Sequence, residues 1–297
     1  MNKKNLLFVV LMVVSWAFYF VLCKICITIS GSPFVAGLFL RIMTCVFLSI
    51  YCGITGRKIR IGKKPLLLTV LIGSIAFFFD VLINIGFQYV PVSIGTVLLK
   101  TEILFVLLIS LVVLKIEIKK WNCLFIVVML LGVVLCMDIQ SLNMQFNKYS
   151  FLFIVSAALN AGCAFVIKHI QEKYAIGSFV VAYINNFVSL VLYVVCTSLF
   201  GINQISLLFS EINRMGFTIY IFLLCSICQT CLMVTYYRNL EALPVWGVKA
   251  SLLFVPALSM IVEIVFLQTT IGWLSFWGFL LVSIGGLGII LNSRNTK

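Results

Sequence analysis

Two oppositely charged side chains, Lys100 and Glu102, lie inside a helix-length apolar run that extends from residue 92 to residue 118. An ionised side chain at the centre of a bilayer costs at least about 2.5 to 3.5 kcal/mol on insertion scales, so such residues usually face a bundle interior, a partner or a water-filled path. A carboxylate in a low-dielectric cavity can bind a proton or a cation, and a buried lysine can hold a carboxylate. The run is therefore a candidate site for binding a small polar molecule.

The composition is that of an integral membrane protein. Of the 297 residues, 63% are hydrophobic and 10% are charged, and the mean hydropathy is +1.23, whereas soluble domains are about 45–50% apolar. The apolar segments run on at helix length without the short alternation of a barrel, which predicts an all-helical fold. At roughly 20 residues per span, the chain has room for about ten transmembrane helices. The first apolar run is too long for a signal-peptide core, so we expect it to be a retained first helix.

We expect the ten spans to form two sets of five. The first set covers residues 6–27, 33–54, 65–90, 92–118 and 121–138, and the second covers 151–168, 178–200, 217–238, 245–267 and 271–291. The polar linker at 140–150 places a boundary between residues 1–140 and 141–297 of one membrane domain. Pro91 and Pro244 precede the fourth and ninth spans, and Trp121 and Trp273 begin the fifth and tenth. Repeats with an odd number of helices insert in opposite orientations, so we predict two inverted five-helix repeats, as in many secondary transporters.

The distribution of lysine and arginine predicts that both termini are cytoplasmic. With the N-terminus inside, the basic segments at 56–64, 115–120 and 168–173 fall inside, whereas only Lys24, Lys148 and Arg214 fall outside. The formal net charge of +13 therefore reports orientation in the membrane rather than binding of nucleic acid. We expect a multi-pass protein of the bacterial plasma (cytoplasmic) membrane.

Four charged residues of the first half are expected in one layer. Arg41, Asp80 and Lys100 lie about 10 to 13 Å below the outer surface when helical rise is counted from the span ends, and Glu102 lies one step deeper. Two residues apart on an α-helix, Lys100 and Glu102 point about 160° away from each other. We therefore expect them to face different neighbours, with an ion pair between Lys100 and Asp80 or between Arg41 and Glu102. A transport path and a structural ion-pair network both remain open as interpretations.

Other polar and aromatic residues are candidates for the wall of a cavity. Asp80, Asn84 and Gln88 share one helix face at i, i+4 and i+8, which is hard to place except toward an aqueous path. Trp16 and Tyr19 lie in mid-membrane, although these residue types prefer the interfaces. They could stack on a substrate or simply pack between helices.

The second half offers fewer candidates. Gln229 lies in the eighth span, and the polar residues Asn185 and Asn186 in the seventh either line a cavity or hydrogen-bond between helices. Lys249 lies about one turn inside the cytoplasmic end of the ninth span, where its side chain either extends toward water, which we favour, or faces the transport path. Glu263, near the outer end, is expected at the interface.

The sequence contains no clear constellation for enzymatic or metal chemistry. Cys23 and Cys26 have ligand-like spacing but lie in an apolar helix without a paired histidine, and His169 is the sole histidine of the chain. The glycines at 285–288 lie in a span and favour close helix packing rather than a phosphate loop. We expect no cofactor, no metal site, no nucleic-acid partner and no enzymatic activity.

The arrangement resembles the EamA-type members of the drug/metabolite transporter superfamily over about residues 6–292. The matching features are Ser15 with Trp16, Pro33 with Arg41, Glu102, Glu117 ahead of Trp121, and Pro256. The resemblance implies a ten-helix bundle with both termini inside, a central cavity between inverted repeats, and alternating access for small metabolites, commonly export. Ile103 stands where many members have a proline, which leaves open whether the first half has the helix break that Pro256 predicts for the second.

We predict a secondary active transporter that moves a small polar or zwitterionic, amino-acid-like metabolite, with export and proton coupling through Asp80 or Glu102 as hypotheses. Its partners would be that substrate, the lipid bilayer and protons, and the protein would be a monomer or a homodimer. The alternatives are an exporter of amphiphilic or cationic drug-like compounds, and a membrane protein with a lipid-handling or structural role. The predicted path comprises Trp16, Tyr19, Arg41, Asp80, Asn84, Gln88, Lys100, Glu102, Gln229 and Lys249.

Overall fold

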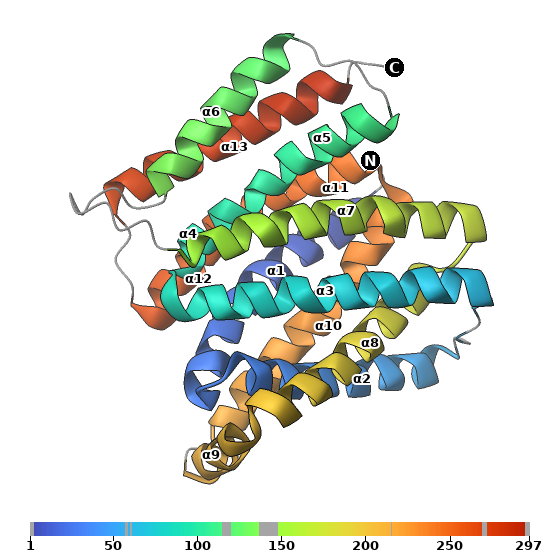
Figure 1. Ribbon diagram of the computed structural model, residues 1–297, viewed down its shortest axis with the longest axis vertical. Coiled ribbons are helices and arrows are strands. Elements are labelled where there is room, and N and C mark those ends of the chain that lie inside the picture. Colours follow the sequence, from blue (N-terminus) through green and yellow to red (C-terminus); the bar gives the residue numbers. More distant parts are fainter. Residues whose placement is uncertain are drawn as a thin grey trace.

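Long helices packed side by side make up the computed structural model (Figure 1). The structure describes residues 3–56, 59, 61–114, 120–136, 148–214, 216–268 and 272–294. Within these ranges, eight helical segments are long and apolar enough to cross a membrane. The prediction of an all-helical membrane protein is confirmed for the described part of the chain.

The helices lie where hydropathy placed them. The first half contains α1 (Lys3–Ser30), α2 (Pro33–Thr55), α3 (Lys63–Tyr89), α4 (Val92–Leu98), the 3₁₀ turn η1 (Leu99–Thr101), α5 (Glu102–Leu114) and α6 (Lys120–Cys136). The second half contains α7 (Ser150–Tyr174), α8 (Ser178–Phe200), α9 (Ile202–Arg214), α10 (Thr218–Ala242), α11 (Val245–Ser251), η2 (Leu252–Phe254), α12 (Val255–Leu267) and α13 (Trp273–Arg294). Glu117 and most of the polar linker at 140–150 lie outside the described residues.

Local sequence sets the boundaries of α2. Ser32 is its N-cap and accepts a hydrogen bond from the backbone N–H of Val35, and Pro33 follows in the first turn, where its missing N–H costs nothing. Gly56 ends the helix in the left-handed conformation, with φ of 62°, which glycine adopts without steric cost.

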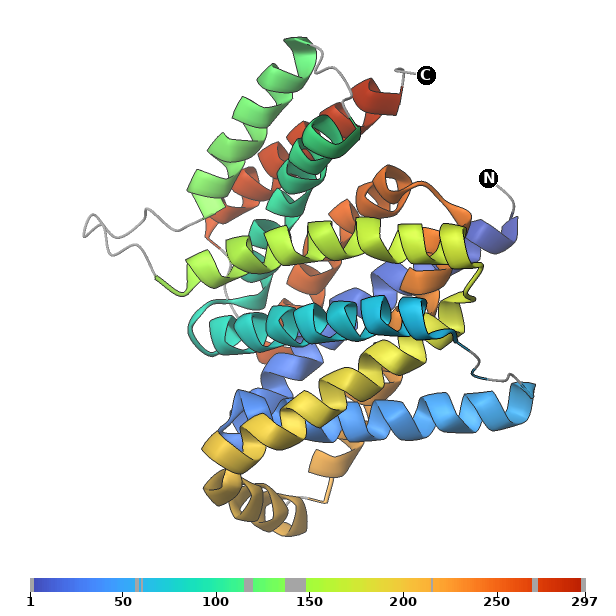
Figure 2. The ribbon, with the colours of Figure 1, turned by 45° about the vertical axis from the view of Figure 1, so that its right-hand side comes forward.

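The short helix α9 is an addition to the predicted plan. Between the seventh and eighth expected spans, residues 202–214 form a 13-residue helix that packs against α1, α8 and α10 (Figure 2). Its side chains divide into Leu208, which is fully buried, and Phe209 and Ile202, which are exposed. Such an amphipathic helix suits the interface of a membrane rather than its interior.

Both halves contain the same broken helix. Val92 and Val245, Leu99 and Leu252, and Glu102 and Val255 begin matching elements and are each 153 residues apart. The break therefore exists in the first half although Ile103 replaces the proline. Near each break a hydroxyl donates to the carbonyl three residues earlier, from Thr101 to Leu98 and from Ser251 to Val248, and this type of bond competes with the α-helical ladder.

Glu263 anchors the start of the first broken helix. Its carboxylate accepts hydrogen bonds from the backbone N–H groups of Val92 (2.9 Å) and Ser93 (2.7 Å), which have no partner inside α4. Lys24 lies 3.8 Å from the same carboxylate and donates to the carbonyl of Val90. The side chain of Glu263, which we expected at the interface, is completely buried within the protein as a cap between α1, α4 and α12.

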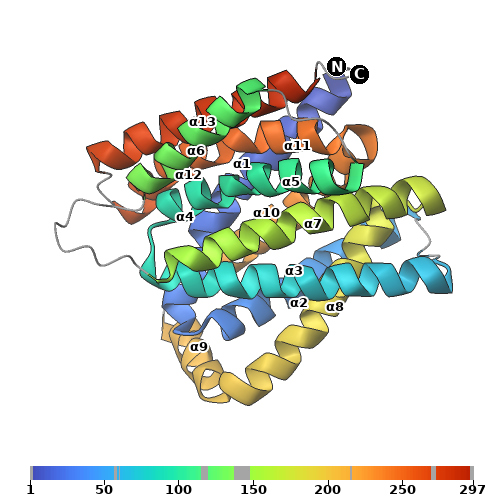
Figure 3. The same cartoon turned by 45° about the horizontal axis from the view of Figure 1, so that its top comes forward.

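Helices of the first half pack mainly on helices of the second. The helix α1 packs on α10, α3 on α7 and α8, and α2 on α8 and α10. The pair α6 and α13 lies at one edge of the bundle, at the top of Figure 3. There Gly132, Gly285 and Gly288 let the two helices approach closely, because a Cβ at Gly132 would lie 2.7 Å from the carbonyl oxygen of Gly278.

Described basic residues gather at one end of the bundle, to the right in Figures 1 and 2. Lys63 and Lys64 begin α3, Lys168 and Lys173 lie near the end of α7, and Arg238 lies near the end of α10. Lys168 joins the last two of these helix ends by donating to the carbonyl of Leu240 at 2.9 Å. The start of α1 and the end of α13 lie on this same side.

The opposite half of the bundle is filled by large side chains. Phe87, Phe153 and Tyr193 have no exposed surface. The Tyr193 ring occupies the space beside Gly37, where a Cβ would lie 2.2 Å from the ring. The absence of a side chain at Gly37 is therefore a packing requirement of the contact between α2 and α8.

We expect Gly37→Ala to lower the free energy of unfolding by about 1–3 kcal/mol, because the added methyl group overpacks a filled contact. Gly162→Ala is the matched control, since a Cβ at this helical glycine meets nothing within 4 Å and alanine favours the helix by about 0.5–1 kcal/mol. Thermal unfolding of the purified protein in detergent measures both. Equal melting temperatures for the two variants would contradict the packing account.

Candidate functional site

A cavity lies between the two halves of the chain and is lined by helices from both. The wall comes from α1, α2 and α3 of the first half and from α7, α8 and α10 of the second, and it surrounds about 650 Å³ of space, including the part open to solvent. Its polar and aromatic lining residues are Trp16, Tyr19, Phe20, Arg41, Phe79, Asp80, Asn160, Asn185, Gln229, Tyr236 and Tyr237. A cavity with a few polar groups among apolar walls suits a small molecule.

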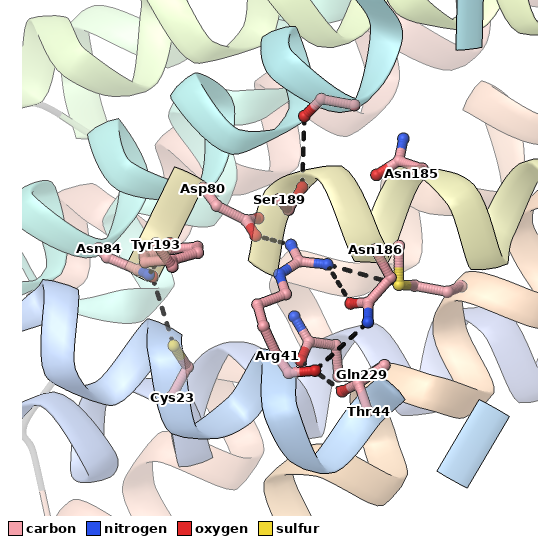
Figure 4. Close-up of polar contacts among 12 residues, drawn as sticks. Cys23, Arg41, Thr44, Asp80, Asn84, Asn185, Asn186, Ser189, Tyr193 and Gln229 are labelled. Atoms are coloured by element: carbon pink, nitrogen blue, oxygen red, sulfur yellow. Dashed lines mark hydrogen bonds and ion pairs between the residues drawn. The ribbon is translucent and has the colours of Figure 1, made fainter. Parts of the chain in front are cut away.

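Arg41 and Asp80 form an ion pair at this wall (Figure 4). The exposed fractions are 4% for Arg41 and 8% for Asp80. A second guanidinium nitrogen of Arg41 donates to the Asn186 amide oxygen at 2.9 Å and contacts the Met233 sulfur at 3.5 Å. The pair thus ties α2 to α3 and to both α8 and α10, and its two charges face a space that a ligand can enter.

Two hydrogen-bonding atoms near the cavity have no partner in the described structure. The Nε of Arg41 is a buried donor without an acceptor, and the Oδ1 of Asn185 is a buried acceptor without a donor. The amide nitrogen of Asn185 is used, since it donates to the Tyr237 hydroxyl at 2.6 Å. Buried polar atoms are nearly always paired, so these two atoms are exceptions among the residues that line the cavity.

Gln229 links three helices at the cavity wall. Its Oε1 accepts a hydrogen bond from Thr44 at 2.8 Å, and its Nε2 donates to the Tyr19 hydroxyl at 3.2 Å. Trp16 packs edge-on against Tyr236, with ring centroids 5.2 Å apart. These aromatic and amide side chains are held by one another and so present a fixed lining.

A second charged cluster lies behind the wall. The Oε2 of Glu102 accepts hydrogen bonds from Lys249 (2.9 Å) and from Asn160 (2.7 Å), and Lys249 also donates to the Tyr236 hydroxyl at 3.2 Å. Asn160 and Tyr236 line the cavity, whereas Lys249 and Glu102 lie beyond them. The cluster joins α5 and α7 to α10 and α11.

The expected extension of Lys249 toward water is wrong. Its side chain has no exposed surface and points into the bundle, because a carboxylate from the other half lies there. A buried charge needs a well-placed counter-charge and further hydrogen bonds, and Glu102 and Tyr236 supply them. The pairing joins residues 147 positions apart, so neither side chain predicts the other from sequence.

The expected separation of Lys100 from Glu102 is also wrong. Their Nζ and Oε1 atoms lie 3.6 Å apart. Residues 99–101 form a 3₁₀ turn, in which two residues differ by about 240° rather than about 200°, so the side chains diverge by roughly 120°. The length of the lysine side chain closes the remaining gap. Asp80 is paired with Arg41 instead of Lys100, and Glu102 with the two lysines instead of Arg41.

The predicted polar stripe on α3 divides between different surroundings. Asp80 lines the cavity, but Asn84 is buried in a contact with Cys23 and Tyr193 (Figure 4). Gln88 lies near the end of α3 and is exposed. Of the predicted path residues, the cavity lining includes Trp16, Tyr19, Arg41, Asp80 and Gln229, whereas Asn84, Gln88, Lys100, Glu102 and Lys249 lie elsewhere.

Asn160 is a wall residue to which sequence reasoning gave no role. The available signal was its position as an amide in the middle of the apolar run at 151–168, a place where a polar side chain needs a partner. Among the described residues, no group of three histidine, cysteine or acidic side chains is arranged to hold a metal ion.

Three comparisons relate the chain to known proteins. Residues 3–137 match the model of the EamA-like transporter family. No curated protein sequence matches the chain. A solved structure titled "Crystal structure of protein" is similar in fold, with a TM-score of 0.68 and 12% identity over 99% of both chains. At that identity the likeness concerns the fold alone.

The cluster behind the wall predicts a ranking of three substitutions. Glu102→Gln leaves two buried lysines without a carboxylate, and we expect it to cost about 3–5 kcal/mol of unfolding free energy. Lys249→Met is expected to cost less unfolding free energy, because Glu102 still has Lys100 3.6 Å away. Lys100→Met is expected to cost the least, because the contact of Lys100 with Glu102 is longer than a hydrogen bond. Denaturation of the purified variants measures the order, and the account fails if Lys100→Met is the most destabilising.

Proposed function

Because the chain is an EamA-type member of the drug/metabolite transporter superfamily, with residues 3–137 matching that family, we propose that it is a secondary active transporter for a small polar or zwitterionic, amino-acid-like metabolite. It would export this substrate across the plasma membrane by alternating access. The observation that carries the proposal is the Arg41–Asp80 ion pair at the wall of a cavity shared by both halves.

The proposed architecture is ten spans in two inverted repeats, residues 1–140 and 141–297. In this plan α1, α2, α3 and α5 of the first half correspond to α7, α8, α10 and α12 of the second. In support, contacts between the halves have counterparts with the roles exchanged: α1 packs on α10 as α7 does on α3, α3 on α8 as α10 does on α2, and α1 on α12 as α7 does on α5. A two-fold axis that exchanges the repeats requires such matching. Each half also contains a helix in which a 3₁₀ turn interrupts the α-helical pattern, at residues 99–101 and 252–254, 153 residues apart, and interrupted helices at matching positions of two repeats are common in secondary transporters.

The charges of the site suit a zwitterion. Arg41 has an unused donor at Nε, and Asp80 offers a carboxylate on the same wall. A substrate carboxylate would bind Arg41 and its amine would bind Asp80 or the free Asn185 oxygen, so that the substrate partly replaces the protein's own ion pair. Such exchange keeps both buried charges compensated, which lowers the cost of binding.

The basic end of the bundle supports the proposed orientation. Lys63, Lys64, Lys168, Lys173 and Arg238 lie on the side where α1 begins and α13 ends, and the positive-inside rule places that side in the cytoplasm. The opposite half is closed by Phe87, Phe153 and Tyr193. The arrangement corresponds to a state in which the outer half is sealed.

The aromatic lining favours a second candidate, an exporter of amphiphilic cations. The same space is lined by Trp16, Tyr19, Phe20, Tyr236 and Tyr237. The attraction between a cation and one aromatic face contributes about 0.5–2 kcal/mol to binding. The two candidates differ in their use of Arg41, because a zwitterion needs the guanidinium and a cation does not.

Proteoliposome transport separates these candidates. For a zwitterion, we expect Arg41→Met and Asp80→Asn each to lower the initial rate at least tenfold, since each loses one charge-assisted contact. The exposed His169 on α7 provides the control, and His169→Ala should transport like the wild type. A cation whose transport survives Arg41→Met but not Asp80→Asn would replace the zwitterion as the substrate.

Proton coupling through Asp80 or Glu102 is the final part of the proposal. In the double variant Asp80→Asn with Glu102→Gln, we expect a pH gradient no longer to raise transport above the exchange rate of that same variant, because neither the carboxylate at the cavity nor the one behind its wall remains to carry the proton. Exchange of labelled for unlabelled substrate needs no net proton movement and serves as the control reaction. Unchanged pH-driven transport in the double variant would rule out coupling through these two residues.

A further inference from the structure

The positive and negative charges of three ionisable side chains behind the cavity wall do not balance. Lys100, Glu102 and Lys249 are 5%, 2% and 0% exposed, and they comprise two ammonium groups and one carboxylate. The nearby pair Arg41 and Asp80 is already balanced. Among the described residues, two protonated lysines and one carboxylate therefore leave one positive charge over in a low-dielectric region, where an uncompensated charge is expensive.

Hydrogen bonding assigns the excess to Lys100. Lys249 is satisfied by Glu102 and by the Tyr236 hydroxyl. The 3.6 Å separation between Lys100 and the Oε1 of Glu102 is longer than a hydrogen bond, and this Oε1 has no hydrogen-bond partner in the described structure. Lys100 thus retains donors that the described side chains do not use.

The cavity wall gives a ligand access to this excess charge. Asn160 and Tyr236 line the cavity and also contact Glu102 and Lys249 directly. Lys249 donates to the oxygen of Tyr236, so the hydroxyl proton of Tyr236 is free to point into the cavity. An anion held by Tyr236 and Asn160 would lie one side chain from Lys249 and two from Lys100, with Glu102 between them, where charges interact strongly because little water screens them.

We propose that the wall formed by Asn160 and Tyr236 is a subsite for one anionic group of the substrate, a carboxylate or a phosphate, and that Lys100 determines the preference for anionic over neutral groups. The inference rests on the proposed transport function and extends it. It places the anionic group of an acidic metabolite at this wall, apart from the Arg41–Asp80 pair that would hold its zwitterionic end.

Binding of two matched probe pairs to the purified protein tests the subsite. Glutamate differs from glutamine, and O-phosphoserine from serine, mainly by the anionic group, and calorimetry gives each dissociation constant. We expect at least one acidic probe to bind about tenfold or more tightly than its neutral partner, which is the effect of one charge-assisted hydrogen bond. Comparison of the pairs tells whether carboxylate or phosphate is preferred.

Three variants connect that preference to the charge count. Lys100→Met removes the excess charge and should bring the preference to about one, whereas Glu102→Gln adds to the excess and should keep or increase it. If Glu102→Gln cannot be purified, Tyr236→Phe should weaken the acidic probe at least threefold with no change in charge. Lys24→Met is the control, because Lys24 is a membrane lysine paired with Glu263 at the far end of α4. The preference of this variant for the acidic probes should equal that of the wild type.

Equal binding within both probe pairs, or no binding of any of the four probes at millimolar concentration, would overturn the subsite. So would the same shift in preference from Lys100→Met and Glu102→Gln. The proposed transport function fails separately, if proteoliposomes move none of the probes that the purified protein binds.

Discussion

The contact between Glu102 and Lys249 is the interaction on which the interior of the bundle depends. Inside a membrane there is no water to stabilise an ionised side chain, so each buried charge requires a partner from the protein itself. Glu102 follows the break of the first broken helix, and Lys249 precedes the break of the second. Their 2.9 Å hydrogen bond therefore joins the two least regular parts of the two halves. Asn160 and Tyr236 extend the contact to α7 and α10 and bring it to the cavity.

A second group of polar contacts holds the other side of the cavity. Arg41 draws together α2, α3 and α8 through Asp80 and Asn186, and Gln229 joins α10 to α1 and α2. The cavity thus lies between two charged groups that differ in character. The pair of Arg41 and Asp80 is balanced and faces the space, whereas the group of Lys100, Glu102 and Lys249 lies behind the wall with one extra positive charge. This difference gives a ligand two chemically distinct ends of the site.

The end of the bundle opposite the basic residues is organised by packing and by one helix cap. Glu263 satisfies the first N–H groups of α4, and Lys24 lies beside both the carboxylate and the preceding loop. The space between the helices at this end is filled by Phe87, Phe153 and Tyr193, close to glycines that leave room for these rings. The proposed alternating access requires this part to open, and helices that meet through small residues and one carboxylate can separate as rigid units.

The sequence by itself determined the membrane class, the helix positions and the residues that need a partner. Apolar runs of about 20 residues leave a chain no alternative to helices in lipid, and α4 and α11 begin directly after Pro91 and Pro244 as predicted. The partners were beyond the sequence, because Glu102 and Lys249 are 147 positions apart and Arg41 and Asn186 are 145. Helix periodicity gives the direction of a side chain only relative to its own helix, and the 3₁₀ turn at 99–101 changed even that for Lys100. Which helices face one another is decided by packing over the whole bundle, so only the tertiary structure placed Asn160 in the wall and Lys249 away from water.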